Sequence, residues 1–136
     1  MTRSPSSCCA SPDRLNSPLA TPALLAIAEQ AGLDILTLAE NLDRDALLRS
    51  RLTRREVERQ LGIVCAALAD LERKLGHAMP EIDWSAWTRL DPALRSPGGS
   101  ARDDALWFAV DSLTPALLLW LRVHRASRPE LFAMRC

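Results

Sequence analysis

The stretch TRREVERQLGIVCAALADLERKLG, residues 53–76, has the clearest helical pattern in this sequence. Apolar side chains recur along it at three- and four-residue steps and form one stripe: Val57, Leu61, Val64, Leu68, Leu71 and Leu75. Residues 53–56 have the spacing of a capping box, in which the Thr53 and Glu56 side chains satisfy each other's free amides. Gly76 stands where a helix-ending glycine belongs. We therefore predict an amphipathic helix that begins at Thr53 and ends at Gly76.

A second apolar stripe precedes this helix. Thr21 is a suitable N-cap, and Pro22 at the first helical position needs no hydrogen-bond donor. The stripe consists of Leu24, Ile27, Ala28, Ala31, Ile35, Leu38 and Leu42. These features predict a helix over residues 21–42, followed by a connecting turn or a single helical turn over residues 43–51.

The C-terminal half predicts shorter helices separated by breaks. Asp83 can cap a helix that carries Trp84, Trp87 and Leu90. Pro92 and residues 96–100 predict a loop. A last helical region begins near residues 101–103 and runs to about residue 125. Within it, residues 114–115 (Thr-Pro) predict either a kink or the start of a further helix.

Length and composition indicate a single all-α domain. The chain has 136 residues, no tyrosine, and 17 basic against 17 acidic residues, so its net charge is zero. That balance gives no general attraction to nucleic acid or to an anionic membrane. Residues 1–20 are rich in serine and proline and predict a disordered tail, and residues 126–136 predict a frayed one. We expect residues 21–125 to form an antiparallel bundle of four to five helices.

The cysteines and apolar runs bear on compartment and cofactors. Cys8, Cys9, Cys65 and Cys136 lack the spacing of a zinc or redox site, and we expect neither a metal nor a cofactor. No secretory segment is present, and the longest apolar run, residues 115–121, is too short to cross a membrane. These features predict a cytoplasmic protein without a membrane partner.

Several charged groups have a structural interpretation that outweighs a functional one. His77 and His124 lack metal-ligand neighbours, and Asp103 and Asp104 suit the first turn of a helix. Residues 97–100 lack the strand and the lysine of a phosphate-binding loop. Acidic residues interleave with the arginines of one region, so we predict a solvated mixed-charge face there rather than an RNA-binding patch: Arg49, Arg51, Arg54, Arg55 and Arg59.

All four tryptophans lie in the C-terminal half. Tryptophan buries a large area, and its N–H seeks a hydrogen-bond partner. We expect Trp84 and Trp107 to belong to the core. Trp87 and Trp120 remain candidates for anchors of a protein interface.

Three segments, in this order and spacing, resemble the HepT-like family of the HEPN superfamily over roughly residues 24–122. Residues 55–67 look like the family's second long helix, and residues 80–84 (PEIDW) look like its P-x-I-P-W segment. Leu106-Trp107 with residues 111–117 (DSLTPAL) looks like its V-W followed by D-L-P-x-L. The resemblance implies a HEPN-like bundle, ribonuclease toxin ancestry, a nucleotidyltransferase-like antitoxin as partner, and a homodimer.

The chemical positions of that family are changed in this sequence. Aligning the landmarks without gaps places Asp91 and Pro92 at the family's Arg-Asn pair, Ser96 at its histidine and Gly98 at its tyrosine. The glutamate of the second helix becomes Ala66. Cleavage of RNA through its 2′-hydroxyl needs a proton shuttle and a cation beside the phosphate. These four positions supply neither, so the site is predicted to be degenerate.

The sequence thus favours a non-catalytic helical interaction module, self-associating, with a nucleotidyltransferase-like partner. The alternative is an active ribonuclease that contacts RNA through Arg89 and Arg95, with His77 or His124 brought in by folding or across a dimer. A third interpretation is a helical scaffold unrelated to HEPN proteins.

Overall fold

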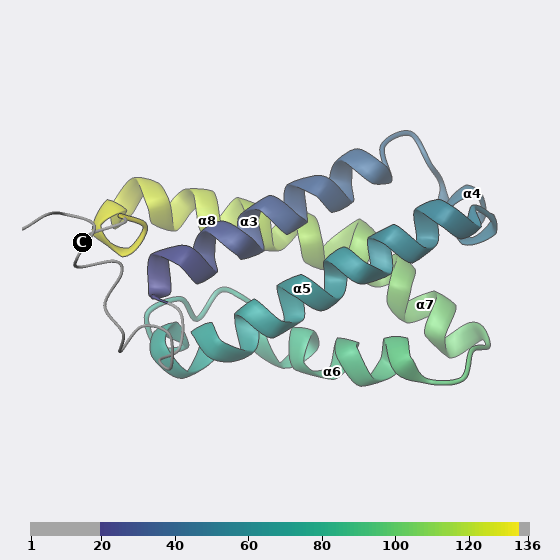
Figure 1. The fold of residues 1–136 in the computed structure, drawn as a ribbon. Helices are drawn as coiled ribbons and strands as arrows, with labels where there is room; N and C mark the ends of the chain where they lie inside the picture. Colours follow the sequence, from purple (N-terminus) through teal and green to yellow (C-terminus); the bar gives the residue numbers. More distant parts are fainter. Residues whose placement is uncertain (1–19, 134–136) are drawn as a thin grey trace, which may run out of the picture.

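The computed structural model describes residues 20–133 and is entirely helix and connecting loop over that range, which confirms the predicted all-α class (Figure 1). The elements are α3 (Thr21–Leu38), α4 (Arg44–Arg49), α5 (Arg51–Leu75), α6 (Trp84–Arg95), α7 (Ser100–Phe108), the π-helical turn η1 (Ala109–Leu113), α8 (Thr114–Ser127) and the 3₁₀ turn η2 (Pro129–Leu131). The predicted N-terminal tail up to residue 19, and Cys8, Cys9 and Cys136 with it, lie outside the described residues.

Four long segments run alternately in opposite directions: α3, α5, α6 and the helix formed by α7, η1 and α8 (Figure 1). Helix α5 packs along α3 and along α6, and α8 closes the bundle against α3. The predicted α5 stripe is buried throughout, and four of its members have no exposed surface: Val57, Leu61, Val64 and Leu71. Burial of apolar side chains, to which this stripe contributes together with those of the other helices, is the main favourable contribution to the fold.

Helix α5 begins earlier than its sequence predicts. Ser50 ends α4 and is also the N-cap of α5, so Thr53 already lies in the first helical turn. The Ser50 carbonyl accepts from the Arg54 amide at 2.8 Å. Glu56 binds the side chains of Arg59 and Gln60 instead of a cap amide. The predicted capping box at residues 53–56 is therefore wrong, because the tight α4–α5 corner moves the helix start upstream.

Gly76 ends α5, but for a physical reason other than the predicted one. Gly76 is the C-cap, but its backbone is right-handed (φ −55°) rather than left-handed. A Cβ at this position would lie 2.7 Å from the Glu72 carbonyl oxygen. Close approach of backbone, and not a left-handed turn, accounts for the glycine.

Helix α3 is shorter than its apolar stripe. It ends at Leu38, and Asn41 then adopts a left-handed conformation (φ +66°), so the predicted end at Leu42 is wrong. Leu42 still packs against the core from the turn, which is why the helical spacing continues past the helix. At the other end Ala20 is the N-cap and Thr21 is the first helical residue, so Thr21 does not cap the helix.

Pro92 lies inside α6 and not in the predicted loop. Asp83 caps this helix as predicted, because its carboxylate accepts from the Ala86 amide at 3.1 Å. Proline removes one helical hydrogen bond, but Leu90 and Leu94 on either side of it are buried and hold the last turn against the core. The loop begins at Ser96 and turns through two glycines with positive φ, Gly98 and Gly99.

Helices α7 and α8 form one continuous helix, Ser100–Ser127, interrupted by the π turn. The Thr114 amide donates to the Ala109 carbonyl, five residues back, immediately before Pro115, which has no amide hydrogen to donate. The predicted kink thus takes the form of a π turn. The helix extends two residues past the predicted end at residue 125, and Phe132 beyond it lies under the Arg125 guanidinium, 4.9 Å from the ring centre.

This 28-residue helix is long and apolar enough to cross a membrane, because its most apolar 18-residue window has a mean hydropathy of 1.4. Length and apolar composition alone do not identify a membrane-spanning helix, because core helices of water-soluble proteins meet the same criteria.

Candidate functional site

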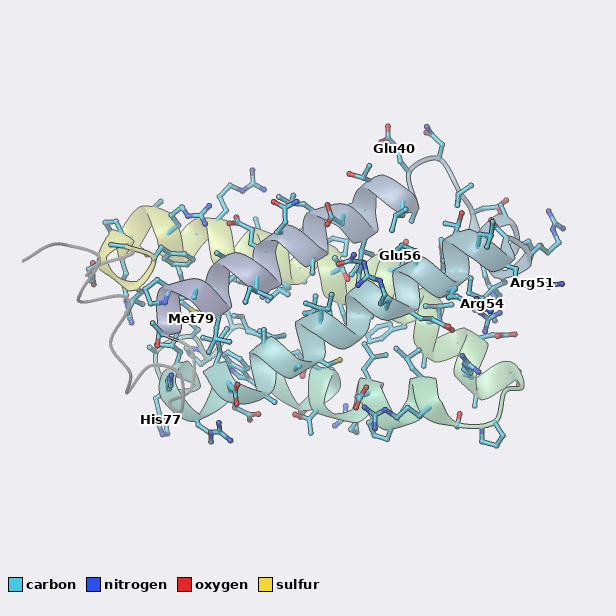
Figure 2. All side chains as sticks on the ribbon, viewed as in Figure 1. Glu40, Arg51, Arg54, Glu56, His77 and Met79 are labelled. Carbon is cyan, nitrogen blue, oxygen red and sulfur yellow. The ribbon has the colours of Figure 1, made fainter. Side chains whose placement is uncertain are left out.

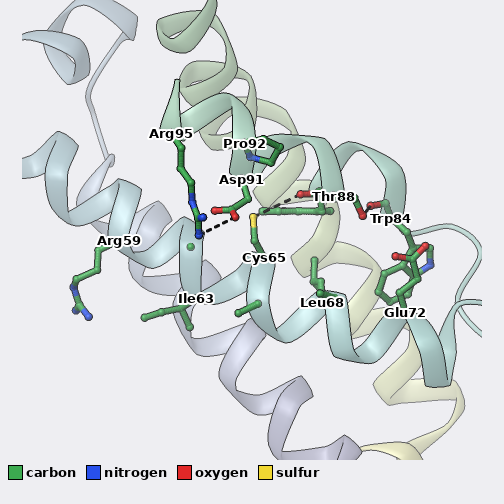
Figure 3. Close-up of a pocket in the computed structure, with 14 residues that line it drawn as sticks. Arg59, Ile63, Cys65, Leu68, Glu72, Trp84, Thr88, Asp91, Pro92 and Arg95 are labelled. Carbon is green, nitrogen blue, oxygen red and sulfur yellow. Dashed lines mark hydrogen bonds and ion pairs between the residues drawn. The ribbon is translucent and has the colours of Figure 1, made fainter. Parts of the chain in front are cut away.

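A groove of about 560 Å³ runs between α5 and α6 (Figure 3). This volume lies within the range of small-molecule and peptide sites. Its lining combines an apolar floor with charged and polar groups along the rims: Arg59, Gly62, Ile63, Cys65, Ala66, Leu68, Ala69, Glu72, Trp84, Trp87, Thr88, Asp91, Pro92 and Arg95.

Three of the positions taken from the family resemblance meet in this groove. Ala66 reaches it from α5, and Asp91 and Pro92 reach it from α6. Ser96 lies past the end of α6, where its hydroxyl donates to the Ala93 carbonyl at 2.8 Å, and Gly98 is exposed in the following loop. The structure therefore brings together three of the five changed positions and leaves Ser96 and Gly98 outside the lining.

Of the two arginines predicted as RNA contacts, only Arg95 lines the groove, and it pairs with Asp91 at 3.1 Å (dashed in Figure 3). Arg89 lines a different, smaller hollow beside Phe108 and Leu113 on another side of α6. Arg89 and Arg95 thus do not share a site.

The remaining cation of the groove is also paired within the chain. Arg59 binds Glu56 through two hydrogen bonds, the shorter at 2.7 Å. Hydrogen bonds from Arg59 and Gln60 lower the pKa of Glu56 to about 2. A phosphate entering the groove would have to compete with these carboxylates for both arginines.

The hydroxyl and thiol of the groove are occupied as donors. Cys65 contacts the Trp87 carbonyl at 3.6 Å, and burial, together with the Asp91 carboxylate, raises the pKa of its thiol to about 12. The Thr88 hydroxyl donates to the Trp84 carbonyl at 2.9 Å. A thiol that stays protonated near neutral pH is a poor nucleophile.

The histidines lie away from this groove. His77 is exposed just beyond α5. His124 on α8 is 6% exposed, its Nε2 lies 2.9 Å from a Glu81 carboxylate oxygen, and its buried Nδ1 has no partner among the described residues. Glu81 lies in the loop before α6, whereas Arg95 is the last residue of this helix, which is about 18 Å long. Folding within one chain does not join either histidine to Arg95.

The burial of the four tryptophans differs in part from the prediction. Trp87 is 2% exposed and belongs to the core, so the prediction that it anchors an interface is wrong. Trp84 packs against the core as predicted and donates its indole N–H to the Met79 carbonyl at 3.0 Å. Trp107 and Trp120 are half-buried against the core, and Trp120 also lies beside the His124 ring.

The arginine-rich region forms the predicted mixed-charge face at the α4 end of the molecule, where Figure 2 labels Arg54. Arg54 pairs with Asp103 at 2.6 Å, Arg102 pairs with Glu58 at 3.1 Å, and Arg44 pairs with Asp104 at 2.6 Å. Asp103 and Asp104 therefore do more than begin a helix: they tie α7 to α5 and α4. Sequence spacing gave no sign of these partners, which are 49 and 60 residues distant.

Comparison of the chain with protein-family models, with curated proteins and with solved structures gives no match.

Proposed function

We propose that this chain is a non-catalytic helical interaction module, a degenerate relative of the HepT-like proteins. The content of the α5–α6 groove carries the proposal. The groove includes Asp91 and Pro92, the positions at which the resemblance puts the Arg-Asn pair, whereas Ser96, at the position of the histidine, lies outside it. None of the described residues lining the groove is a histidine, and Arg95 is paired with Asp91.

The chemistry of RNA cleavage supports this view. A phosphodiester is cut when one group takes a proton from the 2′-hydroxyl and a cation stabilises the charge that develops on phosphorus. Asp91 and Glu72 present negative charge to the groove and would repel a phosphate. Arg95 could bind one only after leaving Asp91.

The same groove suits a protein segment better than a polyanion. Small side chains line its α5 wall at Gly62, Ala66 and Ala69. A Cβ added at Gly62 would meet nothing within 4 Å, so a partner helix could approach the α5 backbone closely there. The partner in this proposal is a nucleotidyltransferase-like protein, together with a second copy of the chain, in a cytoplasmic toxin–antitoxin setting.

A ribonuclease assay tests the proposal. Purified full-length protein is incubated with labelled RNA beside the Arg95→Ala and Arg89→Ala variants, which control for contaminating nuclease. We expect the three proteins to give the same background cleavage. RNA degradation by the unmodified chain that disappears in Arg95→Ala would overturn the proposal and establish the active-ribonuclease alternative.

The partner is tested separately. A small nucleotidyltransferase encoded beside this chain is co-expressed with it, and with Gly62→Leu, which adds bulk to the groove wall at a position where a Cβ meets no other atom within 4 Å. We expect co-purification with the unmodified chain and its loss in the variant.

A further inference from the structure

The helix Ser100–Ser127 leaves an apolar face uncovered. Its most apolar 18-residue window is only 39% buried within the chain. Three large apolar side chains on it are exposed: Phe108 (51%), Leu119 (47%) and Val123 (41%). Exposed apolar side chains gathered along one helix face commonly mark a contact surface.

These side chains follow the spacing of a helix–helix seam. We call the exposed set Phe108, Ser112, Ala116, Leu119 and Val123 the outer face; all five are exposed. Successive members are separated by four, four, three and four residues, which is the alternation that presents one stripe to a partner helix. From Phe108 to Val123 the stripe is about 23 Å long. Its smallest apolar member, Ala116, lies at the middle, where two helices could cross most closely.

One acidic and one basic side chain lie at nearly equal distances on either side of Ala116. Asp111 lies five residues before Ala116 and Arg122 lies six residues after it, and both side chains are exposed. The ion pairs within residues 20–133 involve neither of them. Phe108 and Val123 are likewise eight and seven residues from Ala116.

We propose that a second copy of this chain docks antiparallel on the outer face, with the two helices crossing at Ala116. This arrangement sets Asp111 of each copy against Arg122 of the other, and Phe108 against Val123, by a two-fold axis. A parallel two-fold arrangement would instead place this flank of the two copies on opposite sides of the seam, so that neither Asp111 nor Arg122 would meet its opposite charge. The charges therefore select the antiparallel pair. This inference deepens the proposed function, on which it rests, by naming the surface through which the module self-associates.

Sedimentation equilibrium of the full chain, over about 1–200 µM protein, tests the face. We expect a monomer–dimer equilibrium for the unmodified chain and an increase in Kd of at least about thirtyfold for Leu119→Glu, because a carboxylate would be buried in the seam. Leu52→Glu is the matched control, since Leu52 is an equally apolar and more exposed side chain (79%) at the start of α5. Its Kd should equal that of the unmodified chain.

Charge reversal tests the orientation. Asp111→Arg and Arg122→Asp each place like charges across the antiparallel seam at two symmetric points, and each should raise Kd about tenfold. The double variant restores opposite charges and should return Kd to within about twofold. Circular dichroism of all variants confirms that these exposed substitutions leave the fold intact.

Four outcomes would overturn the inference: a strict monomer at 200 µM, a dimer unaffected by Leu119→Glu, a double variant without rescue, or a monomer that floats with phosphatidylcholine–phosphatidylglycerol vesicles through Leu119. The last result would assign the face to a lipid surface instead. The ribonuclease assay keeps the two proposals apart, because RNA cleavage by an antiparallel dimer would refute the non-catalytic function alone.

Discussion

The two ends of the bundle are closed by different kinds of interaction. At the α4 end, arginine–carboxylate pairs on the surface tie α7 to α4 and α5, and the Arg54–Asp103 and Arg102–Glu58 pairs are less exposed than the Arg44–Asp104 pair. At the opposite end, where Figure 2 labels His77 and Met79, two part-buried hydrogen bonds reach the loop between α5 and α6. Trp84 of α6 donates to the Met79 carbonyl, and His124 of α8 contacts the Glu81 carboxylate. Exposed ion pairs are individually weak and are screened by salt, whereas breaking a buried contact leaves a cavity or an unsatisfied group. The number of interactions at each end is therefore a poor guide to which end stabilises the fold more.

The largest effect in this comparison is expected from His124→Ala. The substitution removes a 6% exposed ring and its contact with Glu81, so we expect the free energy of unfolding to fall by about 2–3 kcal/mol. Urea denaturation followed by circular dichroism measures it. His77→Ala, at an exposed position of the same end, is the control and should change stability by less than about 0.5 kcal/mol. Equal effects of the two substitutions would show that this end is not closed by burial.

A smaller effect is expected from Trp84→Phe. The variant keeps the aromatic ring but removes the indole N–H that donates to the Met79 carbonyl. That carbonyl keeps its longer bond, 3.3 Å, from the Ile82 amide, so the expected loss is about 1 kcal/mol. The same denaturation experiment measures it. Trp107→Phe is the matched control, because Trp107 is similarly half-buried.

The surface network should contribute less per residue and respond to salt. Arg54→Met removes the pairs with Asp103 and Glu58 while keeping an apolar stem, and we expect a loss of about 0.5–1 kcal/mol at low ionic strength. The loss should shrink in 1 M NaCl, in which charges are screened within about 3 Å. Arg55→Met, at an exposed neighbouring position, should show no comparable change. A loss independent of salt would assign the role of Arg54 to packing rather than to charge.

The smallest effect is a pH dependence at the His124 end. The hydrogen bond of Glu81 to its own backbone amide, and then the one with His124, lower the pKa of this carboxyl below its ordinary value of 4.5. A carboxyl with a lowered pKa in the folded chain stabilises it above pH 4.5, and this contribution is lost as the pH falls through the lowered pKa. The Tm difference between the unmodified chain and Glu81→Gln should therefore stay constant from pH 7 to about pH 5 and vanish in acid. A difference that grows in acid would contradict this assignment.

The sequence predicted the helical segments well because apolar periodicity reports directly which face of a helix is buried. The α5 stripe from Val57 to Leu75 and the Asp83 cap of α6 both appear as predicted. The boundaries were less predictable. Leu42 keeps helical spacing although it packs from a turn, and Pro92 is held inside α6 by tertiary contacts of its neighbours, which local sequence rules do not include.

The candidate site was predictable only in part. Ala66 and Asp91 are 25 residues apart in the sequence, and only the antiparallel packing of α5 and α6 brings them to one groove. The buried contact of His124 with Glu81, and the pairs of Asp103 and Asp104, depend on partners more than 40 residues away. No spacing rule reports such partners. The sequence shows that the members of the outer face are three or four residues apart. Only the packing of α3 and α6 shows which side of the helix Ser100–Ser127 remains uncovered.

The π turn at residues 109–113 has a consequence for how this chain tolerates insertions and deletions. Each residue added to or removed from a helix rotates everything beyond it by about 100°. Loss of one residue from the turn would swing α7 around the axis of α8, which would carry Phe108 away from Leu119 and pull Asp103 from Arg54. A single turn of backbone thus sets the angular phase between the half of the helix that is anchored by charge and the half that is packed against α3.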